Sequence, residues 1–250
     1  MGSPCEIQFY TDSRLNAQKI IVRLINTIRN LENRYSRYKA DSTLSIINQR
    51  AASAGRFKVD RETESLLNYA DTCYLESDGL FDISSGALRK IWNFQENQLP
   101  KVDDIRDSLK SIGWDKILWK PPFIEFTQAG MELDFGGIVK EYAADRCAHL
   151  AQEFGIRHGA INLGGDIRII GPHLDGSAWR IAIKSPVQAH QQVYSASLTR
   201  GGIASSGDYE RCMVVDGIKY SHILNPKTGY PSRYLSSVSV IADLCTLAGT

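Results

Sequence analysis

The spacing of apolar side chains predicts helices mainly in the first part of the chain. Between residues 17 and 31, isoleucines and leucines recur every three or four positions, which is the pattern of an amphipathic helix. Asp41 and Ser42 look like a cap that a short helix follows, and apolar residues with helical spacing also follow Asp60. The helices predicted in this way cover residues 17–31, 41–48, 60–77, 103–112 and 136–154.

Short strands are predicted mainly in the second part, where apolar and polar residues alternate. One strand pair meets at Gly164 and Gly165, and another at Pro121 and Pro122. The predicted strands cover residues 6–10, 117–126, 160–170, 179–183, 193–198, 203–205, 212–215 and 236–241. Early helices followed by antiparallel or mixed strands favour the α+β class. Because the sequence has no linker, repeat or low-complexity stretch, we expect a single compact unit over residues 1–250.

The composition argues against several classes of protein. The net charge is +1, whereas a nucleic-acid scaffold or a polybasic membrane binder needs a clustered excess of Lys or Arg. No apolar run reaches the roughly 18 residues of a membrane span. The five cysteines form no C-x-x-C pair, so neither a zinc site nor a disulfide framework is predicted. No secretory signal opens the chain, which as written predicts a cytoplasmic setting.

Two glycine-flanked stretches carry carboxylates that packing alone does not require. In DGLFDISSGAL, residues 78–88, Asp82 either caps a following helix or contacts a ligand. In ELDFGGIVKEYAADRCA, residues 132–148, a predicted strand ends at Asp134 and a glycine pair leads into a helix with Lys140. Amides at a helix N-terminus and a lysine can bind a phosphate. A plain strand-to-helix turn with a solvated lysine explains the pattern equally well.

Three later stretches contain residues that could support other chemistry. The glycine pair of INLGGDIRIIG precedes a strand pattern rather than a helix, which argues against a dinucleotide loop and favours a tight turn with Asp166 at its edge. GGIASSGDYER lacks the G-x-S-x-G spacing, so serine hydrolysis has little support. YSHILNPKTGYP places His222 three residues before a turn at Asn225. That histidine is either the polar residue of a strand or an imidazole aimed at a substrate.

Nine stretches together resemble one known family along nearly the whole chain, the ApbE-like FAD:protein FMN transferases. In family order they are MGSPCEI, SRYKADSTLSIIN, DGLFDISSGAL, LDFGGIVKEYAAD, INLGGDIRIIG, WRIAIKSP, IASSGDYER, YSHILNPKTGYP and SVSVIA. The resemblance implies an ApbE-like, T-fold-like α+β domain over residues 1–250 that is cut short at its C-terminal end.

The resemblance also implies a reaction. The FMN half of FAD moves onto a Thr or Ser hydroxyl of a target flavoprotein, and AMP leaves. FAD is then the substrate, Mg²⁺ the cofactor and the acceptor flavoprotein the partner. The alternatives are an FAD pyrophosphatase, in which water replaces the acceptor hydroxyl, and a flavin-binding protein without turnover. Family members usually work on the periplasmic side of the bacterial inner membrane, unlike the cytoplasmic setting predicted above.

By the same resemblance, individual residues take roles. The implied general base is His222, which accepts the proton of the acceptor hydroxyl. The implied metal ligand is the backbone carbonyl of Gly137. The implied contacts to FAD come from Met1, Tyr38, Leu80, Phe81, Asp82, Asp134, Lys140 and Leu224.

The sequence departs from the family pattern at its C-terminal end. The family takes its other metal ligands from an A-D-x-x-x-T segment, and Gly249 falls at the aspartate of that segment. Asp243 and Thr246 are nearby but out of register, and the chain ends before the threonine. A hard-cation site that lacks one carboxylate should bind Mg²⁺ more weakly. We therefore expect either a metal held in a different way or a degenerate member of the family.

Overall fold

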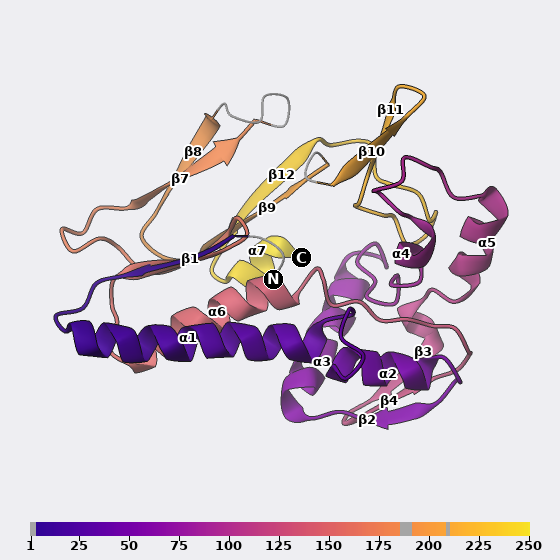
Figure 1. The fold of residues 1–250 in the computed structure, drawn as a ribbon, viewed down its shortest axis with the longest axis horizontal. Coiled ribbons are helices and arrows are strands. Elements are labelled where there is room, and N and C mark those ends of the chain that lie inside the picture. The colour runs from indigo at the N-terminus through magenta and orange to yellow at the C-terminus, as the bar shows by residue number, and fades with distance from the viewer. Residues whose placement is uncertain (1–3, 186–191, 209–210) are drawn as a thin grey trace. The chain divides into compact units, whose positions relative to one another are not determined.

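The computed structural model describes residues 4–185, 192–208 and 211–250, and Figure 1 shows their helices and strands. The chain forms two compact units. The sheet unit comprises the residues up to 34 together with 136–207 and 237–250, and the helical unit comprises residues 35–135 and 208–236. The sequence alone predicts a single compact unit over residues 1–250. The α+β class that it predicted is confirmed.

An antiparallel five-stranded sheet forms the centre of the sheet unit, in the order β1-β5-β6-β9-β12. Gly164 and Gly165 make the predicted tight turn between β5 and β6, and both have positive φ angles that favour glycine. A separate hairpin pairs β7 with β8. The strands of this unit are β1 (Cys5–Phe9), β5 (Gly159–Leu163), β6 (Asp166–Gly171), β7 (Trp179–Lys184), β8 (Gln192–Leu198), β9 (Gly202–Gly207) and β12 (Ser237–Ala242).

Three helices complete the sheet unit: α1 (Arg14–Tyr35), α6 (Val139–Glu153) and α7 (Cys245–Gly249). α6 packs on β5 and β6, and α7 packs on β9 and β12, so the two helices lie on the same side of the sheet in Figure 1. The buried face of α6 is rich in alanine, whose small side chain lets the helix approach the strands closely. The Cys147 thiol lies 3.7 Å from the Leu24 carbonyl, which places α1 beside α6.

The helical unit contains four helices, a three-stranded sheet in the order β2-β4-β3, and the hairpin of β10 and β11. Ser42 and Asp60 accept backbone amides and cap α2 and α3, and the cap at Ser42 lies in the stretch where the sequence predicts one. The elements are α2 (Thr43–Ala51), β2 (Arg56–Lys58), α3 (Arg61–Glu76), α4 (Leu88–Ile91), α5 (Val102–Lys110), the 3₁₀ helix η1 (Trp114–Lys116), β3 (Ile117–Lys120), β4 (Phe123–Phe126), β10 (Cys212–Val215) and β11 (Ile218–Ser221).

One predicted element is wrong and several short ones were missed. The strand predicted to end at Asp134 does not form. Glu132 makes only an isolated bridge with Ser85, and a turn follows. α6 begins at Val139 rather than at Gly136, since glycine disfavours helix. The missed elements are β2, α4, η1, β11 and α7, each of three to five residues. None of the described helices is long and apolar enough to cross a membrane. All five cysteines are free thiols.

Candidate functional site

The loop that carries Asp82 is fixed by hydrogen bonds to that carboxylate. Asp82 Oδ1 accepts the Ser84 amide at 2.7 Å, and Oδ2 accepts the Trp114 amide at 3.1 Å. Burial raises the pKa of Asp82 above its ordinary value, and the two amides oppose that rise. α4 begins after Ala87 and not at Asp82, so this carboxylate does not cap it. Asp82 instead anchors its loop to η1.

The side chains that precede Asp82 lie nearer to the surface. Leu80 is 54% exposed, and Phe81 is half-buried. Tyr38, the other aromatic of the predicted flavin site, is 84% exposed. Large exposed apolar side chains are available to a flat ligand, although single ones also occur on ordinary surfaces.

Asp134 belongs to an ion-pair network of the helical unit. Its Oδ2 lies 2.9 Å from Arg37 Nη1 and 2.6 Å from Arg89 Nε. The same Arg37 reaches Glu132 Oε1 at 3.0 Å, and Lys90 Nζ lies 2.5 Å from Glu132 Oε2. Three cations thus face two carboxylates, and the carboxylates hold the cations in fixed positions. The amide of Asp134 also donates to the Ile83 carbonyl at 2.7 Å, which joins this network to the Asp82 loop.

His222 lies immediately before a turn that its own neighbours close. The Asn225 side chain accepts the amides of Lys227 at 2.8 Å and Thr228 at 3.2 Å, and Gly229 donates to the Asn225 carbonyl at 2.8 Å. His222 Nδ1 lies 3.1 Å from the Arg211 carbonyl oxygen. A carbonyl only accepts, so the proton of a neutral imidazole is on Nδ1 and the lone pair is on Nε2.

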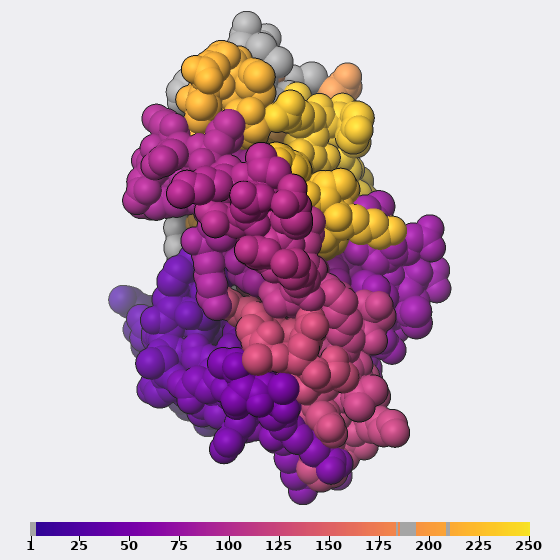
Figure 2. All heavy atoms as spheres, turned by 90° about the vertical axis from the view of Figure 1, so that its right-hand side faces the viewer, coloured from indigo at the N-terminus to yellow at the C-terminus, as the bar shows by residue number. Residues whose placement is uncertain are grey.

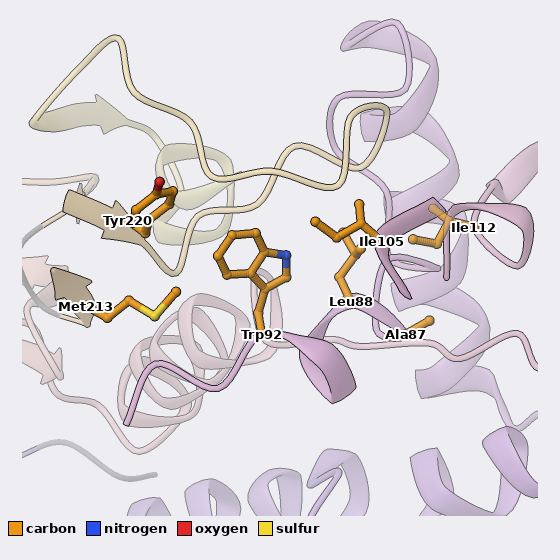
Figure 3. Packing of buried hydrophobic residues seen from close by; sticks show 7 residues of the cluster. All are labelled: Ala87, Leu88, Trp92, Ile105, Ile112, Met213 and Tyr220. Atoms are coloured by element: carbon orange, nitrogen blue, oxygen red, sulfur yellow. The ribbon is translucent and has the colours of Figure 1, made fainter. Parts of the chain in front are cut away.

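A hydrophobic cluster joins the turn after His222 to the segment after the Asp82 loop. Trp92 lies between Tyr220 and Leu88 in Figure 3, and its Nε1 donates to the Gly229 carbonyl at 2.8 Å. Leu224 packs against the edge of this cluster. The members of the cluster are Ala87, Leu88, Trp92, Ile105, Ile112, Met213 and Tyr220. In the segment after β11, Gly229 lies against Ile105 and Leu109 of α5, and Figure 2 shows yellow C-terminal atoms beside magenta ones at the surface. Apolar packing therefore sets the position of the His222 corner.

The sheet unit contains a second group of charged side chains, at the start of α6. Lys140 Nζ lies 2.5 Å from Asp166 Oδ2 and 3.9 Å from Glu141 Oε1. Glu141 and Asp166 are buried. Burial, followed by the neighbouring Asp166 carboxylate, raises the pKa of Glu141 from 4.5 to about 8. Gly137 is exposed in the turn that precedes the helix.

A third carboxylate of this unit holds α7 in place. Asp145 accepts the Cys245 amide at 2.9 Å, the Thr246 amide at 2.8 Å and the Thr246 hydroxyl at 2.6 Å. Arg168 Nε adds an ion pair at 3.1 Å. Asp145 thus acts as a cap for the first turn of α7, supplied by a different helix.

The residues predicted from the sequence are divided between the two units. Gly137 and Lys140 belong to the sheet unit, and Met1 lies outside the described residues. The helical unit holds Tyr38, Leu80, Phe81, Asp82, Asp134, His222 and Leu224. The charged neighbours that no sequence motif indicates are Arg37, Arg89, Lys90, Glu132 and Glu141. Arg37 and Glu141 each adjoin a selected residue, which is the one signal that could have pointed to them.

Comparison with known proteins identifies the class. An FAD:protein FMN transferase of Klebsiella pneumoniae is 32% identical over 249 residues, which cover 97% of this chain and 75% of that protein. An FAD:protein FMN transferase of Haemophilus influenzae is 26% identical over 255 residues, which cover 97% of this chain and 74% of that protein. Both relatives are transferases named for their action on a flavin, and the present chain is an enzyme of the transferase class.

Solved structures agree with the sequence relatives. The ApbE protein of Thermotoga maritima superposes with a TM-score of 0.90 at 32% identity, over 99% of this chain and 81% of that one. The flavin transferase ApbE of Vibrio cholerae superposes with a TM-score of 0.81 at 27% identity, over 100% of this chain and 81% of that one. The ApbE family model matches residues 1–250. The chain belongs to the ApbE family.

Proposed function

We propose that this enzyme transfers FMN from FAD onto a Thr or Ser hydroxyl of an acceptor flavoprotein and releases AMP. The names of the relatives support transfer of FMN from FAD to a protein, whereas the Thr or Ser acceptor and the release of AMP follow from the family resemblance. The observation in this chain that best supports the proposal is the fixed imidazole of His222. A phosphoryl-type transfer needs positioning and charge stabilisation more than covalent help from the enzyme. Within the helical unit, the fixed corner can supply positioning and the cations around Asp134 can supply charge stabilisation.

The proposed role of His222 is that of general base. Nε2 accepts the proton of the acceptor hydroxyl while the hydroxyl oxygen forms a bond to the phosphorus of the FMN half. The bond from that phosphorus to the bridging oxygen breaks, and AMP leaves with this oxygen. The Arg211 carbonyl keeps the other ring nitrogen protonated, so the base is in the correct tautomer before substrate arrives.

The remaining residues are proposed to bind FAD. Tyr38, Leu80 and Phe81 offer apolar surface to the isoalloxazine ring, and Leu224 supports the His222 corner. Asp134 acts by orienting Arg37 and Arg89, whose positive charge suits a pyrophosphate. Lys140 adds a cation at the start of α6.

A magnesium ion is proposed as the cofactor, and the sheet unit has oxygen atoms that fit it. A buried carboxylate oxygen of Glu141 has no hydrogen-bond partner among the described residues, and the Gly137 carbonyl belongs to the turn before the same helix. Such oxygen donors are the ligands that Mg²⁺ prefers. When bound, the ion supplies positive charge to the pyrophosphate.

The test is flavinylation of an acceptor by the purified chain. The chain is incubated with FAD, Mg²⁺ and an acceptor flavoprotein domain, and covalent flavin is read by in-gel fluorescence and by mass. His222→Ala should abolish transfer, whereas His149→Ala, on the exposed face of α6, should leave it unchanged. Steady FMN release without acceptor would favour the pyrophosphatase. FAD bound without any AMP would favour a flavin-binding protein.

A further inference from the structure

The carboxylate of Glu141 occupies the space that a side chain at position 249 would need. A Cβ atom added to Gly249 would lie 2.5 Å from Glu141 Cγ, 3.0 Å from Cδ and 3.1 Å from Oε1. Both residues belong to the sheet unit, Glu141 in α6 and Gly249 in α7. Glycine at 249 is therefore what allows the Glu141 side chain to enter this position.

Glu141 is buried more completely than its charge would allow without a partner. Its side chain belongs to a residue that is only 5% exposed, and its Oε2 has no hydrogen-bond partner among the described residues. Asp166, 2% exposed, is the nearest other carboxylate, and two ionised carboxylates can only accept hydrogen bonds. Lys140 lies on the Asp166 side, at 2.5 Å from that residue and 3.9 Å from Glu141. A buried carboxylate that is left in this state costs stability unless a cation or a proton joins it.

The neighbouring Asp145 already provides the polar attachment of α7 to α6. Asp145 is on the same helix one turn later, and its two oxygens accept two amides and one hydroxyl and pair with Arg168. The attachment of α7 is thus already provided. Glu141 extends toward the same helix at Gly249, and its Oε2 has no hydrogen-bond partner among the described residues. Without a cation, the neighbouring Asp166 carboxylate favours a proton on Glu141, and a divalent cation could take the place of that proton.

We propose that Glu141 is the carboxylate ligand of the divalent cation of this enzyme, in the place that the family resemblance assigns to position 249. The carboxylate has moved from α7 to α6, and the glycine at 249 makes room for it. This inference rests on the proposed function, because it assumes a metal-dependent transferase. Mg²⁺ is commonly held by one or two carboxylates together with substrate phosphates.

The experiment measures metal binding directly. Mn²⁺, used as the probe for Mg²⁺, is titrated into the full chain with FAD present, and free Mn²⁺ is followed by electron paramagnetic resonance. Glu141→Gln keeps the shape of the side chain and removes its charge. The substitution should weaken Mn²⁺ binding by more than about tenfold, because even residues that only orient a metal ligand change the affinity by about that factor. Glu153→Gln, on the exposed end of the same helix, is the matched control and should not change the affinity.

A second set of variants tests the exchange of positions. Gly249→Asp alone should fold poorly or fail to strengthen Mn²⁺ binding, because its Cβ meets Glu141. Glu141→Ala alone should lose binding, and Glu141→Ala combined with Gly249→Asp should regain it. Mn²⁺ binding by Glu141→Gln within about twofold of the unsubstituted chain would overturn the proposal, since the loss of a ligand costs far more. So would a lack of Mn²⁺ binding by the unsubstituted chain. FMN transfer is measured separately, so that failure of the proposed function is recognised by itself.

Discussion

The two charged groups of this protein differ in the balance of their charges. In the helical unit, Glu132 and Asp134 face three cations and are held by short contacts. In the sheet unit, the buried Glu141 and Asp166 have Lys140 as their near cation, and one carboxylate oxygen has no partner among the described residues. The first group is complete as folded and serves to hold side chains in place. The second is short of positive charge, which is what a site for a cation requires.

Removal of a cation from the complete group should have the largest effect on stability. Arg37→Ala takes two contacts from carboxylates that are mostly buried. We expect a loss of about 3 kcal/mol in the free energy of unfolding, because an ion pair broken in a buried site leaves an uncompensated charge. The measurement is urea unfolding followed by circular dichroism.

The matched control for Arg37 is a cation of the same group at the surface. Lys90 contacts Glu132, but its side chain is 64% exposed. Lys90→Ala should cost less than about 1 kcal/mol, since exposed pairs contribute little. Equal losses for the two variants would contradict the view that burial makes the Arg37 contacts important.

Removal of the Glu141 carboxylate from the group in the sheet unit should stabilise the protein at high pH, whereas removal of Arg37 should destabilise it. Folding raises the pKa of Glu141 from 4.5 to about 8. The folded state therefore binds a proton that the unfolded state releases, and the associated stability is present below about pH 4.5 and is lost as the pH rises through about 8. In the presence of EDTA, the free energy of unfolding should fall over this pH range by an amount on the order of a few kcal/mol, and the melting temperature should fall with it.

Glu141→Gln removes this dependence and gives the test. Thermal melts between pH 5 and about 8.5 should show a flatter profile for the variant than for the unsubstituted chain, and a more stable variant at the upper end. Glu153→Gln, whose carboxylate is on the surface, should keep the original profile. A variant that loses stability at the alkaline end would show that Glu141 is already paired in the folded protein.

Local patterns in the sequence predicted much of the fold but not this difference in charge. Asp60 and the spacing after it gave α3 almost to the residue, because capping and helical periodicity are properties of neighbours in sequence. The division into two units depends on pairings such as β1 with β5, which join distant segments. The same is true of Arg37 and Asp134, 97 positions apart, and of Glu141 and Gly249. A residue's neighbours along the chain cannot reveal these contacts.

The resemblance to a family selected residues but not their surroundings. It pointed to Asp134 and Lys140 as ligand contacts, and the structure adds the cations around the first and the carboxylates around the second. It also implies that a carboxylate is missing at position 249. The contact between α6 and α7 shows that Glu141 fills the space beside Gly249.

The smallest expected change concerns the neutral contacts that hold the His222 corner. Trp92→Phe keeps the aromatic packing of the cluster and removes the bond from Nε1 to the Gly229 carbonyl. One such hydrogen bond contributes about 1 kcal/mol to stability. Because the corner positions the proposed base, we expect kcat for FMN transfer to fall while KM for FAD stays the same. Trp119→Phe removes a similar bond, to Asn68 at the surface, and is the matched control. If both variants lowered stability alike and neither changed kcat, the corner would be only a structural turn. If Trp92→Phe alone lowered kcat, the helical unit would owe its fixed geometry to neutral packing as well as to its ion pairs.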